Sequence, residues 1–421
     1  MKRLLSLLLV IAMLFGVCAM FTACDGNSVS SEQGEEQKEE KKSNRIKLDM
    51  KDVTVAEEIV YEDNSIVLTV KAISMEDDYV DFLFELKNIS PVYLCVECTN
   101  SVINGISSSN HGFYQSLSSG ESATITLSLY IPLLEYLQVK TIGQLDLYLN
   151  IIDGSDGYIL DEGIKVTVNT SKQDFVHTQT IDGEVLFEKS GIRITLIETT
   201  FSKNADSGMF VFVENKTDKF ATVDLNNVVL NGWLQPFSYI STNLLPATNT
   251  VTFIDLSGLE NMGIKKAKDI QNMSFDVSAY EQNYNSICQE RQVSYIPGDK
   301  NFVKELNIEG KTVFDNDIVQ ILLVDAWVED RYPVFQLYFK NKTDVYLTLS
   351  LCELIINGNP CTSTLPTNLP ASAQSLQNFY IHGEGVYTVD SISELDSVTG
   401  YLFMFDYDGN DYLEKIEFPL D

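Results

Sequence analysis

The chain has 421 residues, of which 60 are acidic and 29 are basic, so its formal net charge at pH 7 is −31. A negative charge of this size repels nucleic acids and anionic lipid headgroups, which excludes a nucleic-acid-binding protein. It favours solubility and, weakly, cationic partners. A solvated surface on an exported protein explains the charge without any specific role.

The N-terminus has the pattern of an export signal. Lys2 and Arg3 precede an apolar run from Leu4 to Phe15, which is shorter than the about 20 residues that span a bilayer. The run is typical of a secretory signal peptide over residues 1–23. The stretch Phe21-Thr22-Ala23-Cys24 resembles a bacterial lipobox, although Phe21 stands where leucine is usual.

The lipobox resemblance implies that Cys24 becomes the first residue and carries a diacylglyceryl group, which would anchor the protein to the outer face of the bacterial cell membrane. The alternative is ordinary secretion with Cys24 left free. Residues 24–45 are polar and acidic with almost no apolar side chain, so we expect a lipidated cysteine followed by a disordered tether.

One sequence frame occurs three times after the tether. Asn88, Asn215 and Asn341 are 127 and 126 residues apart, and each is followed sixteen residues later by an Asn-Gly pair, at 104–105, 231–232 and 357–358. Equal spacing over such lengths indicates a tandem array of one domain. We therefore expect three repeats over residues 46–170, 171–297 and 298–421, with short linkers near 170–174 and 297–301.

The residues before each frame asparagine alternate in polarity as a half-buried strand does. The apolar positions are Phe82, Phe84 and Leu86; Met209, Val211 and Val213; and Phe335, Leu337 and Phe339. A turn and an aromatic residue follow, and Asn-Gly then signals a hairpin. About seven strands per repeat predict an all-β fold of three immunoglobulin-like β-sandwiches. Short helical patches are expected at Leu259–Asp269 and Ser391–Asp396, and the register of the Ile318–Val324 run stays open.

The stretch from Asn215 to Lys219, with Asn231-Gly232 and the segment from Asp255 to Ile270, resembles a repeated module of surface lipoproteins from anaerobic Gram-positive bacteria. It is similar in style to telokin-like, immunoglobulin-like modules. The resemblance covers residues from about 51 to 421 and is weakest in the first repeat. It implies a sandwich fold and surface placement, and it brings no catalytic or binding residue.

Seven cysteines occur, and Cys18 and Cys24 belong to the signal region. Cys95 and Cys98 form a CxxC, but residues three apart on a strand face opposite sides, and no second pair accompanies them. A zinc site is therefore not expected. Cys352 and Cys361 flank the Asn357-Gly358 turn, and both a disulfide and free thiols are compatible with that position.

The sequence contains no known catalytic motif, and its three histidines, His111, His177 and His382, have no partners at metal-binding spacing. We therefore expect a protein that is not an enzyme and that has no cofactor and no metal site. Two Asp/Gly loops, 153–157 and 406–411, are candidates for calcium, although a plain hairpin is favoured because Asp411 stands where an EF-hand loop needs glycine. Each frame asparagine starts Asn-x-Ser/Thr, which favours a hydrogen-bonded strand end over a glycan here.

Three functional hypotheses follow. The first is a membrane-anchored, non-enzymatic lipoprotein that acts as a stalk or as a module binding a protein or glycan. The second is a solute- or carbohydrate-binding accessory protein of a transporter or wall enzyme, which clustered exposed aromatic residues on one sheet would favour. The third is a hydrolase, which needs a carboxylate pair or nucleophile in a cleft. Ligand and oligomeric state are not readable from the sequence.

Overall fold

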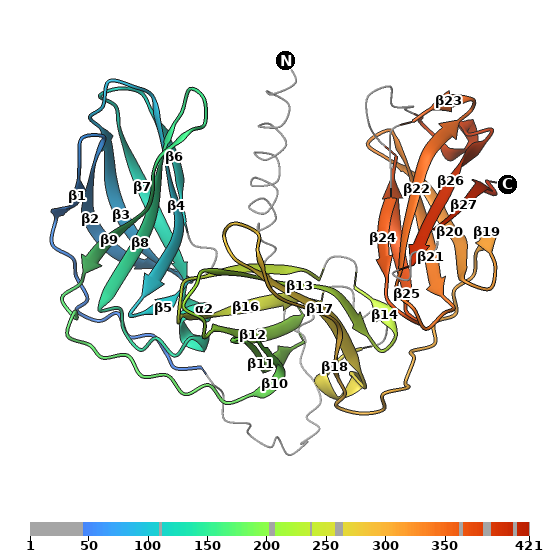
Figure 1. Cartoon of the computed structure of the whole chain (residues 1–421), viewed down its shortest axis with the longest axis horizontal. Coiled ribbons are helices and arrows are strands. Elements are labelled where there is room, and N and C mark those ends of the chain that lie inside the picture. Colours follow the sequence, from blue (N-terminus) through green and yellow to red (C-terminus); the bar gives the residue numbers. More distant parts are fainter. Residues whose placement is uncertain are drawn as a thin grey trace, which may run out of the picture. The chain divides into compact units, whose positions relative to one another are not determined.

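The computed structural model describes residues 45–108, 112–201, 207–235, 238–256, 264–361, 365–381, 389–406 and 411–420. The regular secondary structure of this part of the chain is almost entirely β-strand (Figure 1), which confirms the all-β prediction. The expected signal peptide, Cys24 and all but the last residue of the expected tether lie outside the described residues. None of the helices in the described part is both long and apolar enough to cross a membrane.

The strands fall into three sets of nine with the same pairing pattern. The first set packs β1-β2-β3-β7 as one sheet and β5-β4-β8-β9 as a second sheet, in which β6 also pairs with β4. Its members are β1 (Glu58–Glu62), β2 (Ile66–Glu76), β3 (Tyr79–Asn88), β4 (Leu94–Ile103), β5 (Ile106–Ser107), β6 (Tyr114–Leu117), β7 (Ser122–Tyr130), β8 (Gln144–Asp153) and β9 (Ile159–Asn169). We call these strands repeat 1.

The second set, repeat 2, has the first sheet β10-β11-β12-β16 and the second sheet β14-β13-β17-β18, with β15 also on β13. Its members are β10 (Glu184–Lys189), β11 (Ile192–Thr200), β12 (Gly208–Asn215), β13 (Ala221–Leu230), β14 (Trp233–Leu234), β15 (Ile240–Leu244), β16 (Asn249–Asp255), β17 (Met273–Tyr280) and β18 (Ser286–Tyr295).

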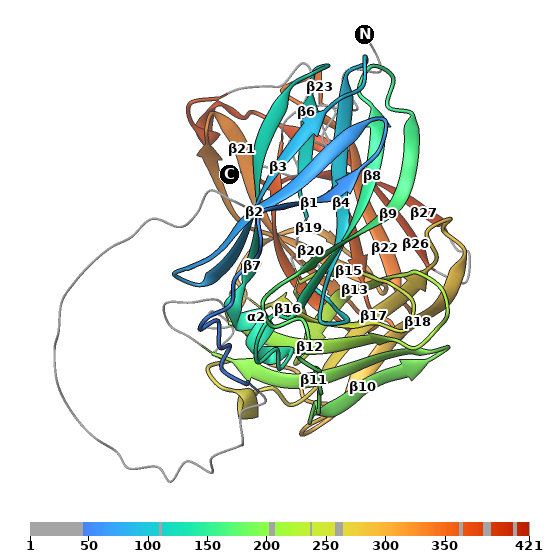
Figure 2. The same cartoon turned by 90° about the vertical axis from the view of Figure 1, so that its left-hand side faces the viewer.

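The third set, repeat 3, has the first sheet β19-β20-β21-β25 and the second sheet β23-β22-β26-β27, with β24 also on β22. Its members are β19 (Lys311–Asp315), β20 (Val319–Glu329), β21 (Tyr332–Asn341), β22 (Leu347–Ile356), β23 (Asn359–Pro360), β24 (Leu365–Leu369), β25 (Gln374–Tyr380), β26 (Val398–Asp406) and β27 (Asp411–Glu417). Figure 2 shows the same strands after a quarter turn.

The order matches an immunoglobulin-like sandwich. In that fold strand B lies beside E, and strand C lies beside F, which lies beside G. Here β3 pairs with β7, and β4 pairs with β8, which pairs with β9. One strand departs from this order: β6, which precedes β7 as strand D precedes E, pairs with β4 and not with β7. Nine strands replace the about seven expected, because an edge strand (β1) and a two-residue strand after the Asn-Gly turn (β5) are added.

The alternating residues predicted to face the core do so. Phe82, Phe84, Leu86 and their counterparts in β12 and β21 are all 0–1 % exposed. Each repeat has a cluster of buried apolar side chains, and the clusters of repeats 1 and 3 also include residues of repeat 2: Phe212 and Val251 in the cluster of repeat 1, and Val229 and Leu234 in that of repeat 3. Burying such side chains is the main favourable contribution to folding, at about 25 cal/mol per Å² of apolar surface.

A β-bulge explains the run whose register the sequence left open. In β20 the pairing with β21 shifts between Leu323 and Asp325, so the alternation breaks there. The same shift occurs between Val70 and Ala72 in β2 and between Leu196 and Glu198 in β11. The bulge is therefore a feature of the repeat.

Two expectations about the connections need correction. The expected helical patches contain only short 3₁₀ turns in the described residues, η2 (Ala267–Asp269) and η3 (Ile392–Glu394), while repeat 1 has a six-residue helix at this place, α2 (Ile131–Tyr136). The connections between the sets are also longer than predicted, covering residues 170–183 and 296–310.

Repeats 2 and 3 share backbone pairing. Trp233 of β14 pairs in parallel with Gln374 of β25, and the Gln374 amide donates to the Gly232 carbonyl at 2.9 Å. This single pair joins the second sheet of repeat 2 to the first sheet of repeat 3 as one nine-stranded sheet. The Trp233 indole is 1 % exposed and donates to the Lys304 carbonyl at 2.7 Å.

Candidate functional site

The three frame asparagines are structural clamps. Asn215 is 1 % exposed, and its amide nitrogen donates to the carbonyls of Lys219 at 2.7 Å and Leu245 at 3.0 Å. Its oxygen accepts from the backbone and hydroxyl of Thr217, at 3.0 and 2.7 Å. The side chain thus ties the β12–β13 turn to the β15–β16 turn.

Asn88 and Asn341 make the same bonds. The Asn341 amide donates to Val345 and Pro370 carbonyls at 2.8 and 3.0 Å, and the Asn88 amide donates to Val92 at 2.8 Å. Because each amide is buried and fully hydrogen-bonded, it cannot serve as a glycan acceptor in the folded chain. The prediction of a strand end bonded to its turn is confirmed.

The second asparagine of each frame does more than turn the chain. Asn104, Asn231 and Asn357 have φ of 51°, 51° and 48°, and the glycine after each is also left-handed, as a type I′ hairpin requires. Each side chain then reaches across to the segment before the next strand of the sheet. The Asn231 amide donates to Asp269 at 2.8 Å, and its oxygen accepts from Gln271 at 2.8 Å.

Cys95, Cys98, Cys288 and Cys352 are free thiols in the structure. Cys98 belongs to the core of repeat 1, while Cys95 lies against Ser116, so the two face opposite sides as predicted. Burial raises the pKa of the Cys98 thiol to about 11. Cys361 donates its backbone amide to Leu354, and Cys352 pairs with Tyr401, so the hairpin does not place Cys352 and Cys361 opposite each other.

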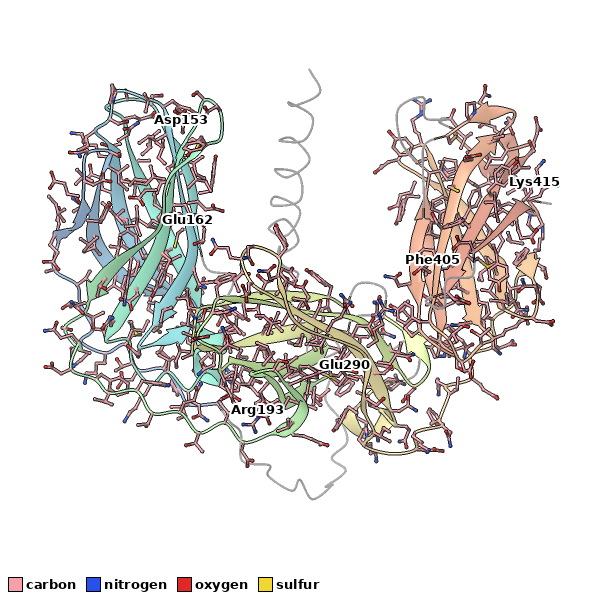
Figure 3. The ribbon with its side chains drawn as sticks, in the orientation of Figure 1. Asp153, Glu162, Arg193, Glu290, Phe405 and Lys415 are labelled. Carbon is pink, nitrogen blue, oxygen red and sulfur yellow. The ribbon has the colours of Figure 1, made fainter. Side chains whose placement is uncertain are left out.

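The polar candidates from the sequence remain separate. No group of three or more His, Cys, Asp or Glu side chains among the described residues is placed to hold a metal ion. In the loop after β8, Asp153 accepts from the Ser155 hydroxyl at 2.5 Å and from its amide at 2.9 Å, which holds the pKa of Asp153 below its usual value. Figure 3 labels Asp153 at this end of β8.

Of the histidines, only His177 is described, and burial lowers its pKa. His111, His382 and residues 407–410 of the second calcium candidate lie outside the described residues.

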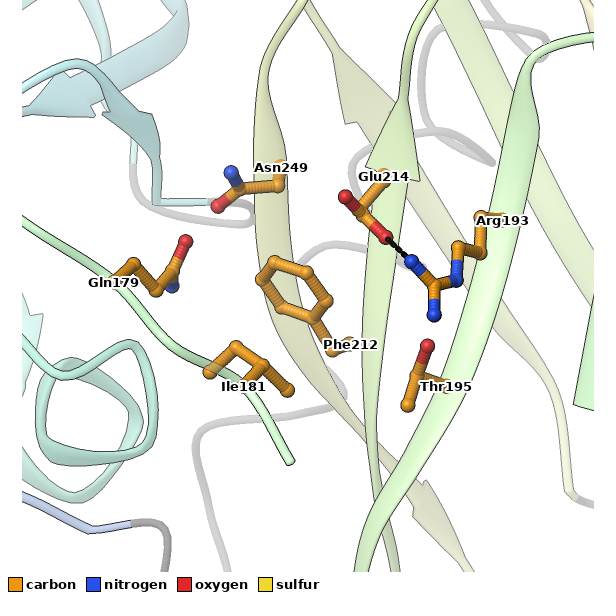
Figure 4. A pocket seen from close by; sticks show the side chains of 7 residues that line it. All are labelled: Gln179, Ile181, Arg193, Thr195, Phe212, Glu214 and Asn249. Atoms are coloured by element: carbon orange, nitrogen blue, oxygen red, sulfur yellow. Dashed lines mark ion pairs between the residues drawn. The ribbon is translucent and has the colours of Figure 1, made fainter. Parts of the chain in front are cut away.

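A cavity of about 150 Å³ lies on the outer face of the first sheet of repeat 2, under residues 179–181 of the preceding connection (Figure 4). Its polar side chains form one cross-strand row. Arg193 on β11 pairs with Glu214 on β12, which pairs with Asn249 on β16. Phe212 and Thr195 form the next row beside it, and Ile181 faces them from the connection.

The row is incompletely paired. The Arg193 guanidinium lies 3.5 Å from the Glu214 carboxylate, and its Nε is 3.9 Å from Glu188. Within the described part of the chain, the buried Arg193 Nε and Asn249 Oδ1 have no hydrogen-bond partner. Buried polar atoms are normally hydrogen-bonded, so these two atoms, which have almost no accessible surface, are exceptions.

Tyrosines gather on the outer face of the second sheet of repeat 2. Tyr239 is 56 % exposed and Tyr284 is 83 % exposed. Tyr280 stacks on Tyr284 with ring centres 5.9 Å apart and donates to Asp224 at 2.8 Å. Tyr239 reaches the other Asp224 oxygen at 3.4 Å. Burial, and then Asp224, raise the pKa of Tyr280 to about 12. We call Tyr239, Tyr280, Tyr284 and Asp224 the tyrosine face.

Related positions of the other repeats also carry aromatic groups, which are exposed in repeat 1 and half-buried in repeat 3. In repeat 1, Tyr93, directly before β4, and Tyr114 of β6 are 43 % and 60 % exposed. In repeat 3, Phe403 and Phe405 of β26 have ring centres 5.9 Å apart (Phe405 in Figure 3). The residues differ between repeats, whereas the asparagine clamps do not.

Sequence reasoning did not find Arg193, Glu214, Asn249 or the tyrosine face. The outward positions of a strand carry polar and aromatic residues alike, so only the pairing of strands shows which of them meet. A usable signal is that these positions are not shared by the three copies. The sequence matches no family model, and comparison with curated proteins gives no match either.

Proposed function

We propose that this protein is a lipid-anchored, non-enzymatic protein on the outer face of a bacterial cell membrane, which binds a protein or glycan through its tyrosine face. The observation that carries the proposal is that Tyr239 and Tyr280 both donate to Asp224, while the exposed Tyr284 stacks on Tyr280. The export pattern and lipobox-like residues before Cys24 support the placement.

Tyrosine suits a recognition surface because its ring offers a large apolar area and its hydroxyl a hydrogen bond, at a low cost in side-chain entropy. The neighbouring groups are polar. Thr222 donates to the Asn243 side chain at 2.8 Å beside the tyrosines. Rings interleaved with hydroxyl, amide and carboxylate groups fit a hydroxyl-rich partner, such as a neutral glycan, as well as a polar protein surface.

A stalk is the second candidate, and contacts between repeats 2 and 3 favour it. The Tyr346 hydroxyl donates to Asp276 at 3.0 Å and accepts from Asn227 at 2.6 Å, while Arg291 lies 5.4 Å from the Tyr346 ring centre. With the Trp233–Gln374 pair, these bonds would limit bending at this connection. A stalk predicts that no ligand binds to the tyrosine face.

The anchor is tested by growth with a radioactive fatty acid. We expect label on the full chain and none on the Cys24→Ala variant. Equal label on both chains would reject Cys24 as the lipidated residue. The membrane fraction of the variant measures how far localisation depends on the anchor.

The binding role is tested on a glycan array and by photo-crosslinking on intact cells. We expect the double variant Tyr239→Ala, Tyr284→Ala to lose at least tenfold in affinity at an unchanged melting temperature, because both side chains are exposed. The matched control is Tyr79→Ala, an exposed tyrosine on the first sheet of repeat 1. Unchanged binding in the double variant, or none by the native chain, would favour the stalk.

A further inference from the structure

The contact between repeats 2 and 3 shows how this chain holds an arginine. The Arg291 guanidinium lies 5.4 Å from the centre of the Tyr346 ring, and the Tyr346 hydroxyl donates to Asp276 at 3.0 Å. A positive charge is attracted to the electron-rich face of an aromatic ring. The carboxylate bonded to the hydroxyl adds a negative charge beside the ring, so the ring and the carboxylate attract the guanidinium together.

The same arrangement occurs between repeats 1 and 2. The Arg45 guanidinium lies 5.2 Å from the centre of the Tyr136 ring, and the Tyr136 hydroxyl donates to Glu198 at 2.8 Å. Arg45 also forms an ion pair with Glu135. In the described part of the chain these are the two contacts between a cation and an aromatic ring, and in both the ring belongs to a tyrosine bonded to a carboxylate.

The tyrosine face has the tyrosine and the carboxylate of this arrangement. Tyr280 donates to Asp224 at 2.8 Å, and Tyr284 stacks on Tyr280 with ring centres 5.9 Å apart. Tyr284 is 83 % exposed, so the side of its ring that is turned away from Tyr280 is open to solvent. None of the described residues places a cation over these rings.

Asp224 and Asp276 occupy neighbouring outward positions on the second sheet of repeat 2. Asp276 of β17 pairs with Asn226 of β13, two residues after Asp224 on the same strand. Asp276 is used within the chain, because it accepts from Tyr346 beside Arg291. Asp224 has no such arginine among the described residues, so this end of the same face offers a place for one from outside.

We propose that the tyrosine face binds an arginine side chain of a partner protein, with the guanidinium over the exposed Tyr284 ring and attracted by the Asp224 carboxylate. A guanidinium suits this place because it is planar, stacks on aromatic rings and stays charged. A neutral glycan can stack on the rings but gains no charge attraction from Asp224. The net charge of −31 also favours a basic partner. The inference rests on the binding role proposed above and specifies its partner.

The test is titration of the full chain, purified in detergent, with fluorescent peptides of glycine and serine that carry several copies of one test residue. The test residue is arginine, lysine or citrulline, which has the shape of arginine without its charge. A chitin oligosaccharide serves as the neutral glycan. We expect the arginine peptide to bind most tightly, about threefold or more above the lysine peptide, and the citrulline peptide to bind most weakly.

Two variants locate the binding. Tyr284→Leu keeps an exposed apolar side chain without the ring, and Asp224→Asn removes the charge but keeps an oxygen that can accept from Tyr280. Each should weaken binding of the arginine peptide by about threefold or more at an unchanged melting temperature. The matched controls are Tyr79→Leu in repeat 1 and Asp325→Asn in repeat 3, both at exposed positions of a first sheet, and they should leave binding unchanged.

Equal binding of the arginine and citrulline peptides would overturn the proposal, because the charge would then not be recognised. A loss in Asp325→Asn as large as that in Asp224→Asn would overturn it as well, since the acidic chain as a whole would then attract the peptide. If only the chitin oligosaccharide binds, and Tyr284→Leu weakens it, the binding role of the tyrosine face stands and the arginine inference fails. If no probe binds, both are rejected.

Discussion

Asn215 and Thr217 are joined by two hydrogen bonds to one oxygen: the backbone amide and the hydroxyl of Thr217 both donate to Asn215 Oδ1, at 3.0 and 2.7 Å. Asn341 and Thr343 repeat the pair at 2.9 and 2.7 Å. The recurrent Asn-x-Ser/Thr pattern therefore records a buried turn, and its stability can be measured.

Replacing Asn215 with alanine should lower the free energy of unfolding by about 2–4 kcal/mol, because two donors on Thr217 and carbonyls of Lys219 and Leu245 lose a buried partner. Urea denaturation followed by circular dichroism measures the change. The control is Asn243→Ala on the exposed face of the same repeat, which should stay within about 0.5 kcal/mol of the native chain. Equal losses in both variants would show that Asn215 is not a clamp.

The structural features that depend on a local sequence pattern could be predicted from the sequence. Alternation placed Phe84, Val211 and Leu337 in the cores, and Asn-Gly located each hairpin, because a strand has a period of two and a type I′ turn needs two left-handed residues. The bulges in β2, β11 and β20 were not predictable, since an extra residue disturbs the alternation that would reveal it.

The candidate sites depend on long-range pairing. Arg193 and Asn249 are 56 positions apart, and β12 alone brings them into one row. Tyr239, directly before β15, and Tyr280 of β17 both reach Asp224 of β13, because β15 and β17 both pair with β13. Strand order follows from the whole set of pairings, so no window of sequence contains it. The reading that binding residues lie where the copies differ stays a prediction.

Trp233→Ala should destabilise the connection between repeats 2 and 3 by about 3–5 kcal/mol, since the indole is buried, packs 5.9 Å from the Tyr338 ring centre and donates to Lys304. Calorimetry should show one transition separating into two. The only other tryptophan, Trp327, is half-buried on β20, and Trp327→Ala should cost less and leave the transitions joined. A single sharp transition in Trp233→Ala would contradict the coupling.

Calcium should not affect the loop after β8. The Asp153 carboxylate is already engaged by the hydroxyl and amide of Ser155, and Asp156 accepts from the Tyr158 amide at 2.9 Å. We expect no heat on titration with millimolar calcium chloride and no shift in melting temperature. Heat that disappears in Asp153→Asn would assign a site to this loop, whereas heat that persists would point to residues 406–411.

The Cys98 thiol should resist alkylation in the folded protein. Burial raises its pKa from an ordinary value of 9.0 to about 11, so at pH 8 very little thiolate exists, and the core of repeat 1 also blocks access. Iodoacetamide labelling followed by peptide mass spectrometry should modify the half-buried Cys352 at least tenfold faster than Cys98. In urea the two rates should become similar.

The same pKa difference fixes a pH dependence. The folded thiol keeps its proton up to about pH 11, whereas the unfolded thiol loses it near pH 9, so the folded state binds more protons between these values. The contribution of the Cys98 thiol to the free energy of unfolding is thus fully present below pH 9 and is lost as pH rises toward 11. In Cys98→Ala, which cannot ionise, the free energy of unfolding should decline less over that range than in the native chain. An equal decline in both chains would show that the thiol does not titrate differently on folding.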